Sequence, residues 1–205
     1  MARSRMSRAQ RKQQTRGDLL DAARTVFERR GFHRATLEEI SAEAGYTTGA
    51  VYSAFGGKDD LFLAVLDDQI DRRLRLYVDA ALDAGSFEEA GHRWLRTEIE
   101  IGRSEHSWTP LLMEFWTHAA PHDTLRSAVL ERYRRQLDAG TALLEELAAR
   151  HQVTLHVPPR EMVRAIGALA RGLGLERLID PDAALEELYE SYVMAATLAL
   201  SEPAP

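Results

Sequence analysis

Small, hydroxyl-bearing and aromatic side chains fill residues 46–54 in a pattern that suits contact with DNA bases. This segment reads YTTGAVYSA and contains no charged residue. The hydroxyls of Thr48 and Ser53 can hydrogen-bond to base edges, and the methyl group of Ala50 can contact a thymine methyl. Gly49 would let a helix backbone approach the DNA closely. The predicted base-contacting residues are therefore Tyr46, Thr48, Gly49, Ala50, Tyr52 and Ser53.

The residues around this segment carry the signals for two short helices joined by a tight turn. Thr36 and Glu39 have the spacing of a capping box, in which two side chains satisfy unpaired amides of the first helical turn. Gly45 stands where a left-handed residue ends a helix at little cost. Thr47 can cap the helix that follows. We therefore predict a helix-turn-helix over residues 36–55.

A third helix upstream can cover the inner faces of these two. Its apolar residues recur at helical spacing: Leu19, Leu20, Ala23, Val26 and Phe27. Gly31 stands where a C-terminal cap belongs, and Phe32 can fold back onto the last turn. Three short helices that pool these faces make a compact DNA-binding domain, which we place at residues 16–62.

Charge is divided unevenly along the chain. The net charge is −6, but residues 1–34 hold ten basic and three acidic side chains, which leaves 16 basic and 29 acidic ones for the rest. Local positive charge is what phosphate contacts require. We interpret residues 1–15 as a basic, flexible arm that adds electrostatic affinity for DNA. The alternative is a disordered tail whose charge is incidental.

Many residue types between positions 36 and 61 match a known pattern at fixed offsets. The positions compared are Thr36, Leu37, Ile40, Ser41, Ala44, Gly45, Tyr46, Thr47, Gly49, Val51, Tyr52, Ala54, Phe55, Lys58 and Leu61. Through them, residues 16–62 resemble the tetracycline-repressor-like (TetR/AcrR) family of transcriptional regulators. The chain departs from the pattern at Tyr46, where a small apolar residue is usual, and at Ala54, where His or Tyr is usual.

The resemblance implies further DNA contacts. It assigns Thr36, Tyr52 and Lys58 to phosphates, and Lys58 would stand at a helix N-terminus, where backbone amides also favour an anion. Thr47 and Arg16 complete the predicted DNA-binding set. The alternatives are that Tyr52 is an edge of the core and that Lys58 is a solvated surface charge.

Beyond residue 62 the apolar pattern is that of long helices, so we predict an all-α fold. The expected helices cover about 17–30, 37–44, 48–54, 58–83, 86–105, 110–119, 122–150, 159–179 and 182–200. The helix from residue 58 should run unbroken into residues 63–205, which we interpret as a helical effector-binding and dimerisation domain. Residues 151–158 alternate apolar and polar, but we find no strand partner and predict a loop.

Aromatic and methionine side chains gather in the three expected helices between residues 86 and 150. Such side chains line adaptable pockets, although a stripe at helical spacing is more often core than pocket, and the resemblance implies an inducer cavity. The predicted ligand-binding residues are Trp94, Glu98, Trp108, Met113, Phe115, Trp116 and Tyr133. Glu98 falls on an apolar face, where a carboxylate must be paired. We interpret it as the partner of an arginine, with Arg96 and Arg103 nearby in sequence, and a ligand-facing role is the alternative.

The last two expected helices carry apolar and small residues that suit close packing. The resemblance places a dimer interface on them. Its predicted residues are Ile166, Leu169, Ala170, Leu173, Leu188, Tyr192 and Val193. The alternative is that both helices pack only within one chain.

Several kinds of chemistry lack the residues that they need. The chain has no Cys, which excludes disulfides, thiolate nucleophiles and Cys-ligated zinc. Glu114, His118 and His122 are spaced by four, but Pro121 interrupts that helix and Glu114 and His118 should face solvent, so we expect no metal site. No phosphate-cradling Gly loop or nucleophile elbow is present, so we expect neither an enzyme nor a cofactor. No apolar run could span a bilayer and no signal peptide is recognisable, so we expect a cytoplasmic protein without membrane contact.

The sequence favours one function and leaves one alternative. We expect a homodimeric transcriptional repressor that binds a palindromic double-stranded DNA operator and is released by a small, mainly apolar effector. The alternative is a ligand-independent, dimeric DNA-binding or architectural protein. A saturable effect of a small molecule on DNA affinity would separate the two.

Overall fold

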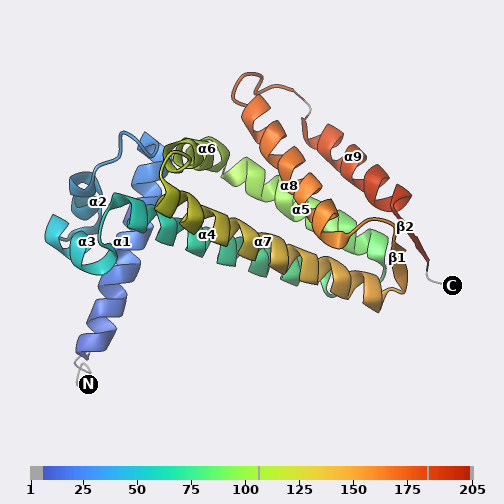
Figure 1. The fold of residues 1–205 in the computed structure, drawn as a ribbon, viewed down its shortest axis with the longest axis horizontal. Helices are drawn as coiled ribbons and strands as arrows, with labels where there is room; N and C mark the ends of the chain where they lie inside the picture. Colours follow the sequence, from blue (N-terminus) through green and yellow to red (C-terminus); the bar gives the residue numbers. More distant parts are fainter. Residues whose placement is uncertain (1–6, 106, 184, 204–205) are drawn as a thin grey trace, which may run out of the picture. The chain divides into compact units, whose positions relative to one another are not determined.

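The computed structural model describes residues 7–105, 107–183 and 185–203. These residues form nine helices and two short strands: α1 Arg8–Arg30, α2 Leu37–Ala44, α3 Thr48–Phe55, α4 Lys58–Ala81, α5 Phe87–Ser104, α6 Trp108–Ala119, α7 Asp123–Arg150, β1 Val153–Leu155, α8 Pro159–Glu176, α9 Leu185–Ala199 and β2 Ser201–Pro203 (Figure 1). The predicted all-α fold is confirmed. None of the described helices is long and apolar enough to cross a membrane.

The chain divides into two compact units. Unit 1 joins residues 1–69 to 111–129, and unit 2 joins residues 70–110 to 130–205. α4, α6 and α7 each give one part to unit 1 and the rest to unit 2. Unit 1 therefore contains the predicted helix-turn-helix together with the greater part of α6.

Aromatic rings form the core of unit 1. Phe115 of α6 stacks on Phe62 of α4 with 4.2 Å between ring centres, and it meets Phe32 edge-on at 4.9 Å. Phe27 near the end of α1 meets the same Phe62 at 5.1 Å. Stacked and edge-to-face pairs stabilise a core beyond the apolar area that they bury. Other large apolar side chains of unit 1 that are fully buried come from α1 to α4 and include Leu19, Val26, Ile40, Val51, Leu61 and Val65.

α1 begins at Arg8, well before the predicted start near residue 17. Ser7 caps it, because its hydroxyl accepts from the Gln10 amide at 3.1 Å and the Gln10 side chain accepts from the Ser7 amide at 2.8 Å. The first turns carry no apolar stripe, so periodicity could not reveal them, although Arg, Gln and Lys are good helix formers. The sequence predicts a flexible arm over residues 1–15; residues 8–15 are instead helical, and residues 1–6 lie outside the described residues.

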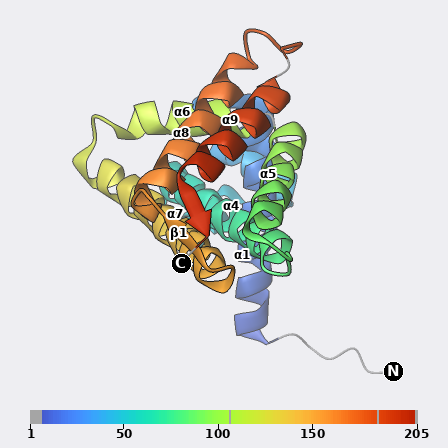
Figure 2. The same cartoon turned by 90° about the vertical axis from the view of Figure 1, so that its right-hand side faces the viewer.

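Two apolar clusters hold unit 2 together. The first joins the end of α4, the start of α5 and the end of α7 through Ala81, Ala84, Phe87, Ala90, Leu147 and Ala148. The second joins α5 to α9 through Leu95, Tyr189, Val193 and Met194, and the α8 side chains Ile166, Ala170 and Leu173 pack against it. α9 lies beside both α5 and α8 (Figure 2). These three helices therefore share an apolar interior within one chain.

The loop predicted over residues 151–158 is wrong in part, because Val153–Leu155 form a strand. β1 pairs antiparallel with β2, and Val153, Thr154 and Leu155 face Pro203, Glu202 and Ser201 (Figure 2). The partner strand follows α9, where the sequence shows no strand pattern of its own. A three-residue strand gives too short an alternation to be recognised without its partner.

Candidate nucleic-acid interface and ligand region

Side-chain caps fix both helices of the predicted helix-turn-helix. The Thr36 hydroxyl accepts from the Glu39 amide at 3.1 Å, and the Glu39 carboxylate accepts from the Thr36 amide at 3.3 Å. Gly45 ends α2 in the left-handed conformation with φ 72°. The Thr47 hydroxyl accepts from the Ala50 amide at 3.3 Å and so caps α3. Both threonine hydroxyls act as acceptors in these caps, which leaves their hydrogens free to donate to a phosphate.

α3 presents one face to solvent and buries the other. Val51 is fully buried, whereas Tyr52 is 57% exposed. Thr47, Gly49 and Ser53 are exposed as well. Thr48 and Ala50 are half-buried, and the Thr48 hydroxyl lies 3.1 Å from that of Ser41 on α2. Among the predicted DNA-binding residues of α3, the exposed side chains are therefore those best placed to meet DNA. Thr48 is only partly exposed, because its hydroxyl also contacts Ser41 of α2.

Tyr46 connects the turn between α2 and α3 to α1. Its hydroxyl donates to the Asp18 carboxylate at 2.8 Å, and its ring is half-buried. A small apolar residue, usual here in the family pattern, could not make this bond. Tyr46 thus ties the turn before α3 to α1 through a hydrogen bond, in addition to its predicted contact with DNA.

Arg16 supports the other end of α3. Its guanidinium donates to the backbone carbonyl of Ala54 at 2.7 Å and lies 4.1 Å above the centre of the Phe55 ring. The last carbonyls of a helix have no partner within it, so this bond satisfies one of them. The Arg16 side chain is exposed, and a guanidinium carries further N–H donors that can reach a phosphate.

Lys58 at the start of α4 is held by its own chain. Its ammonium donates to the His33 carbonyl at 3.1 Å and lies 4.6 Å from the centre of the Phe32 ring. Burial lowers the pKa of Lys58 from its ordinary value. It is thus neither a freely solvated charge nor a fully exposed phosphate ligand.

Glu114 and His118 lie inside unit 1, so the prediction that they face solvent is wrong. The Glu114 carboxylate accepts from the amides of Phe32 at 2.7 Å and His33 at 3.3 Å. His118 places its Nε2 3.1 Å from the Asp59 carboxylate. Their partners lie far away in sequence, in the loop after α1 and at the start of α4. No cluster of three His, Asp or Glu side chains suited to a metal occurs among the described residues.

The predicted ligand-binding residues are divided between the two units. Trp94, Glu98, Trp108 and Tyr133 belong to unit 2, and Met113, Phe115 and Trp116 belong to unit 1. Phe115 is fully buried in the aromatic core, and Trp108 is buried as well. Trp94, Glu98, Met113, Trp116 and Tyr133 are half-buried.

Glu98 is bound by a tyrosine, so its interpretation as the partner of a nearby arginine is wrong. The Tyr77 hydroxyl of α4 donates to the Glu98 carboxylate. Arg103 instead binds Glu186 on α9. Burial, and next the Glu98 charge, raises the pKa of Tyr77 well above its ordinary value. The same two causes raise the pKa of Tyr189, so both tyrosines stay protonated near this carboxylate.

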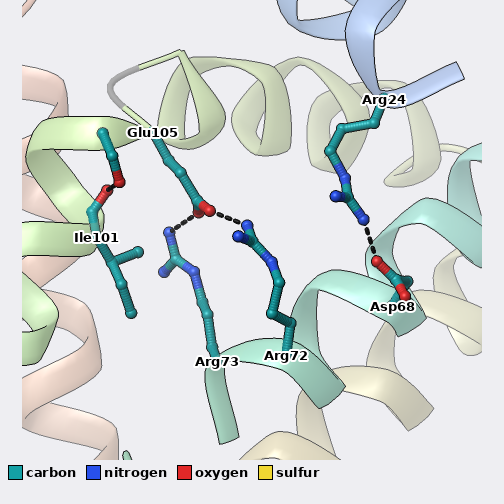
Figure 3. Close-up of polar contacts among 7 residues, drawn as sticks. Arg24, Asp68, Arg72, Arg73, Ile101 and Glu105 are labelled. Atoms are coloured by element: carbon teal, nitrogen blue, oxygen red, sulfur yellow. Dashed lines mark hydrogen bonds and ion pairs between the residues drawn. The ribbon is translucent and has the colours of Figure 1, made fainter. Parts of the chain in front are cut away.

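Arginine pairs lie elsewhere on α4. Figure 3 shows Glu105, which follows α5, bound by Arg72 and Arg73 within unit 2. The same figure shows Arg24 of α1 bound to Asp68 within unit 1. Neither these pairs nor the roles of Asp18, Tyr77 and Tyr189 could be predicted from the sequence, because spacing along one helix cannot reveal a partner on another.

The predicted dimer residues separate into two groups. Val193 is buried inside unit 2, and Ile166, Ala170 and Leu173 pack against the same cluster. Leu169, Leu188 and Tyr192 are exposed. Other large apolar side chains are exposed on α8, on α9 or just after α8: Leu175, Leu178, Ile179 and Leu198. The buried Val193 holds one chain together, the half-buried Ile166, Ala170 and Leu173 keep part of their surface, and the exposed Leu169, Leu188 and Tyr192 are the most available to a partner.

α2 and the capped, exposed α3 together form a helix-turn-helix. Residues 19–65 match the family model of bacterial regulatory proteins of the tetR family. FasR, a transcriptional activator from Mycolicibacterium smegmatis, is 35% identical over 95 residues, which cover 38% of this chain and 43% of FasR. AcnR, a transcriptional repressor from Corynebacterium diphtheriae, is 28% identical over 130 residues, which cover 61% of this chain and 66% of AcnR. The matched segments thus span less than two thirds of either relative.

Solved structures extend the likeness over the whole fold. A TetR transcription regulator from Haloarcula marismortui matches with a TM-score of 0.76 at 18% identity, covering 93% of this chain and 100% of that one. The match to the tetR family thus covers the helix-turn-helix end of the chain, and the likeness to solved structures shows that the rest shares their fold.

Tyr52→Ala is expected to weaken operator binding without unfolding the protein. Tyr52 is exposed, so its loss removes little packing, but a hydrogen bond to a charged phosphate contributes about 1.5–3 kcal/mol, or roughly tenfold in affinity and more. Fluorescence anisotropy with a labelled operator measures the change, and a thermal melt checks the fold. Tyr52→Phe should reproduce most of the loss, because it removes only the hydroxyl. Equal affinities in all three proteins would refute the contact.

Proposed function

We propose that this protein is a homodimeric transcriptional repressor that places the two copies of α3 in successive major grooves of a palindromic operator. The exposed, uncharged face of α3, held by the caps at Thr36 and Thr47, carries the proposal. A two-fold dimer presents two recognition helices about one turn of DNA apart, so the operator should repeat the same symmetry. Activation is the second candidate, because FasR is named as an activator and AcnR as a repressor.

The exposed apolar side chains of α8 and α9 support the dimer. Leu169 is 37% exposed, Leu188 44% and Tyr192 66%. Large contiguous apolar surface is rare on monomers and marks interaction sites. A two-fold interface buries the same patch on both copies, which suits a surface carried by two neighbouring helices. We leave Val193 out of the interface, since its side chain is buried within one chain.

Unit 2 is the proposed effector-binding region. It holds a carboxylate and two buried tyrosines among apolar side chains, and apolar sites with a few polar groups are typical of small-molecule binding. α4 passes from unit 1 into unit 2 as one helix, so a shift of its second half can move its first half. A coupling of about 1–3 kcal/mol is enough for useful regulation. We place the protein in the cytoplasm, where DNA and such effectors meet.

Selection of bound duplexes from a random pool, repeated with candidate ligands, tests the proposal. The expected result is a two-fold symmetric consensus whose recovery falls saturably as one ligand is added. A single asymmetric half-site would refute the dimer on DNA. Recovery that no ligand changes would favour a ligand-independent DNA-binding or architectural protein.

A further inference from the structure

The buried polar groups of unit 2 have more hydrogen-bonding capacity than the fold uses. Tyr189 of α9 is only 4% exposed, yet its hydroxyl has no hydrogen-bond partner among the described residues. A buried hydroxyl without a partner costs free energy, so a native protein rarely keeps one for structure alone. The Tyr77 hydroxyl donates to Glu98, and burial, followed by the charge of Glu98, raises the pKa of both Tyr77 and Tyr189.

Glu98 keeps acceptor capacity as well. One carboxylate oxygen accepts from the Tyr77 hydroxyl, and no ion pair to Glu98 forms within the part of the chain that the structure describes. Arg73 also faces Tyr77, but Glu105 binds its guanidinium at 3.1 Å. The charge of Arg171 lowers the pKa of Tyr189, and this guanidinium lies 5.6 Å from the centre of the Tyr133 ring. The half-buried carboxylate is therefore neutralised by no cation of its own.

Aromatic and apolar side chains surround this carboxylate. The Trp94 and Tyr77 rings lie 5.4 Å apart between centres, and Trp94 packs against the cluster that contains Tyr189. Trp94, Glu98 and Gly102 follow at intervals of four on α5 and so share one face. A Cβ added at Gly102 would meet no atom within 4 Å, so this face has open space one helical turn along α5 from Glu98. Three aromatic rings around a carboxylate are the chemistry that holds an organic cation.

We propose that Glu98, Tyr77, Tyr189 and Trp94 bind the ammonium group of a hydrophobic organic amine. The free Glu98 oxygen accepts one N–H of the ligand, and the Tyr189 oxygen accepts another. The Trp94 and Tyr77 rings contact the positive charge, and the apolar body of the amine lies along the α5 face toward Gly102. This assignment rests on the effector-binding function proposed for unit 2 and names the chemical class of the effector.

Three probes of one shape test the charge preference on the full chain: 4-phenylbutylammonium, 4-phenylbutanol and 4-phenylbutanoate. Isothermal titration should find that the ammonium binds about tenfold more tightly than the alcohol or better, because a charge-assisted hydrogen bond is stronger than a neutral one. The carboxylate should bind most weakly. An ammonium that fails to bind, or that binds no better than the alcohol or the carboxylate, overturns the assignment.

Matched variants test whether Glu98 supplies the negative charge that favours the ammonium. Glu98→Gln keeps a carbonyl acceptor for Tyr77 and removes the charge, so the advantage of the ammonium over the alcohol should disappear. Glu100→Gln changes an exposed carboxylate two residues away on the same helix and should leave that advantage intact. If Glu98→Gln melts too early to titrate, Tyr189→Phe replaces it, with an expected loss of about three- to tenfold for the ammonium alone. Unchanged ammonium affinity in the folded variant refutes the site.

Operator binding, measured in parallel, separates this assignment from the proposed function. An ammonium that binds through Glu98 but leaves operator affinity unchanged would confirm the ligand class and refute the effector role. Operator release by a neutral or anionic probe through this region would refute the ligand class and support the effector role.

Discussion

Phe115→Ala is expected to lower the free energy of unfolding of unit 1 by about 3–5 kcal/mol, the usual cost of truncating a buried phenylalanine. Phe115 is fully buried, stacks on Phe62 at 4.2 Å and meets Phe32 at 4.9 Å, so a cavity would open between α4, α6 and the loop after α1. Operator affinity should fall with it, because the same core supports α2 and α3.

Hydrogen exchange read by mass spectrometry measures this loss unit by unit, which suits a chain whose two units need not unfold together. Peptides covering α1 and α2 should lose protection, and peptides covering α9 should change little. Thr117→Ala alters an exposed position on the same helix and should be nearly neutral. A loss below about 1 kcal/mol for Phe115→Ala would show that the ring lines a ligand site and not the core.

Leu169→Glu combined with Leu188→Glu is expected to convert the proposed dimer to monomers and to reduce operator affinity by about 100-fold or more. Charges buried in an apolar interface lose their hydration without gaining partners. Two linked recognition helices bind more tightly than one by about two to four orders of magnitude, and monomers lose that advantage. Analytical ultracentrifugation reports the mass, and anisotropy reports the operator affinity.

Leu130→Glu is the matched control for this pair. Leu130 of α7 is 41% exposed, which lies between Leu169 at 37% and Leu188 at 44%, but it lies on neither α8 nor α9. The Leu130→Glu variant should therefore remain a dimer with full affinity for the operator. A folded double variant that still sediments as a dimer would show that the subunits meet on another surface. Val193→Glu would be uninformative, because it places a charge in the core of one chain.

Sequence patterns predicted the parts of the fold that local interactions determine. α2 has its predicted bounds and α3 differs by one residue, because Thr36, Gly45 and Thr47 fix these helix ends through bonds to near neighbours. The exposed side of α3 followed from the burial of Val51 on its other side.

Contacts between distant segments could not be predicted in this way. Glu114 looked like a surface residue until the loop after α1 supplied its two amide donors. The sequence did not predict that Tyr77 and Tyr189 act together with Glu98, since the three residues lie on three different helices. β1 was hidden because its partner follows α9. In each case one side chain or strand is ordinary in sequence, and only the tertiary fold gives it a partner.

In the proposed function, the protein finds its operator in two steps that depend on different segments. The first is attraction to DNA of any sequence, and the second is recognition of the operator sequence. Basic side chains lie exposed along the start of α1, at Arg8, Arg11 and Lys12, whereas residues 46–54 carry no charge. Electrostatic attraction to any duplex supports sliding along the genome, and it would come from α1. Discrimination between sites would come from α3. Exchange of residues 46–54 for another base-reading segment should therefore redirect the protein to a new operator while its rate of search along DNA stays the same, which makes this segment the place to engineer specificity.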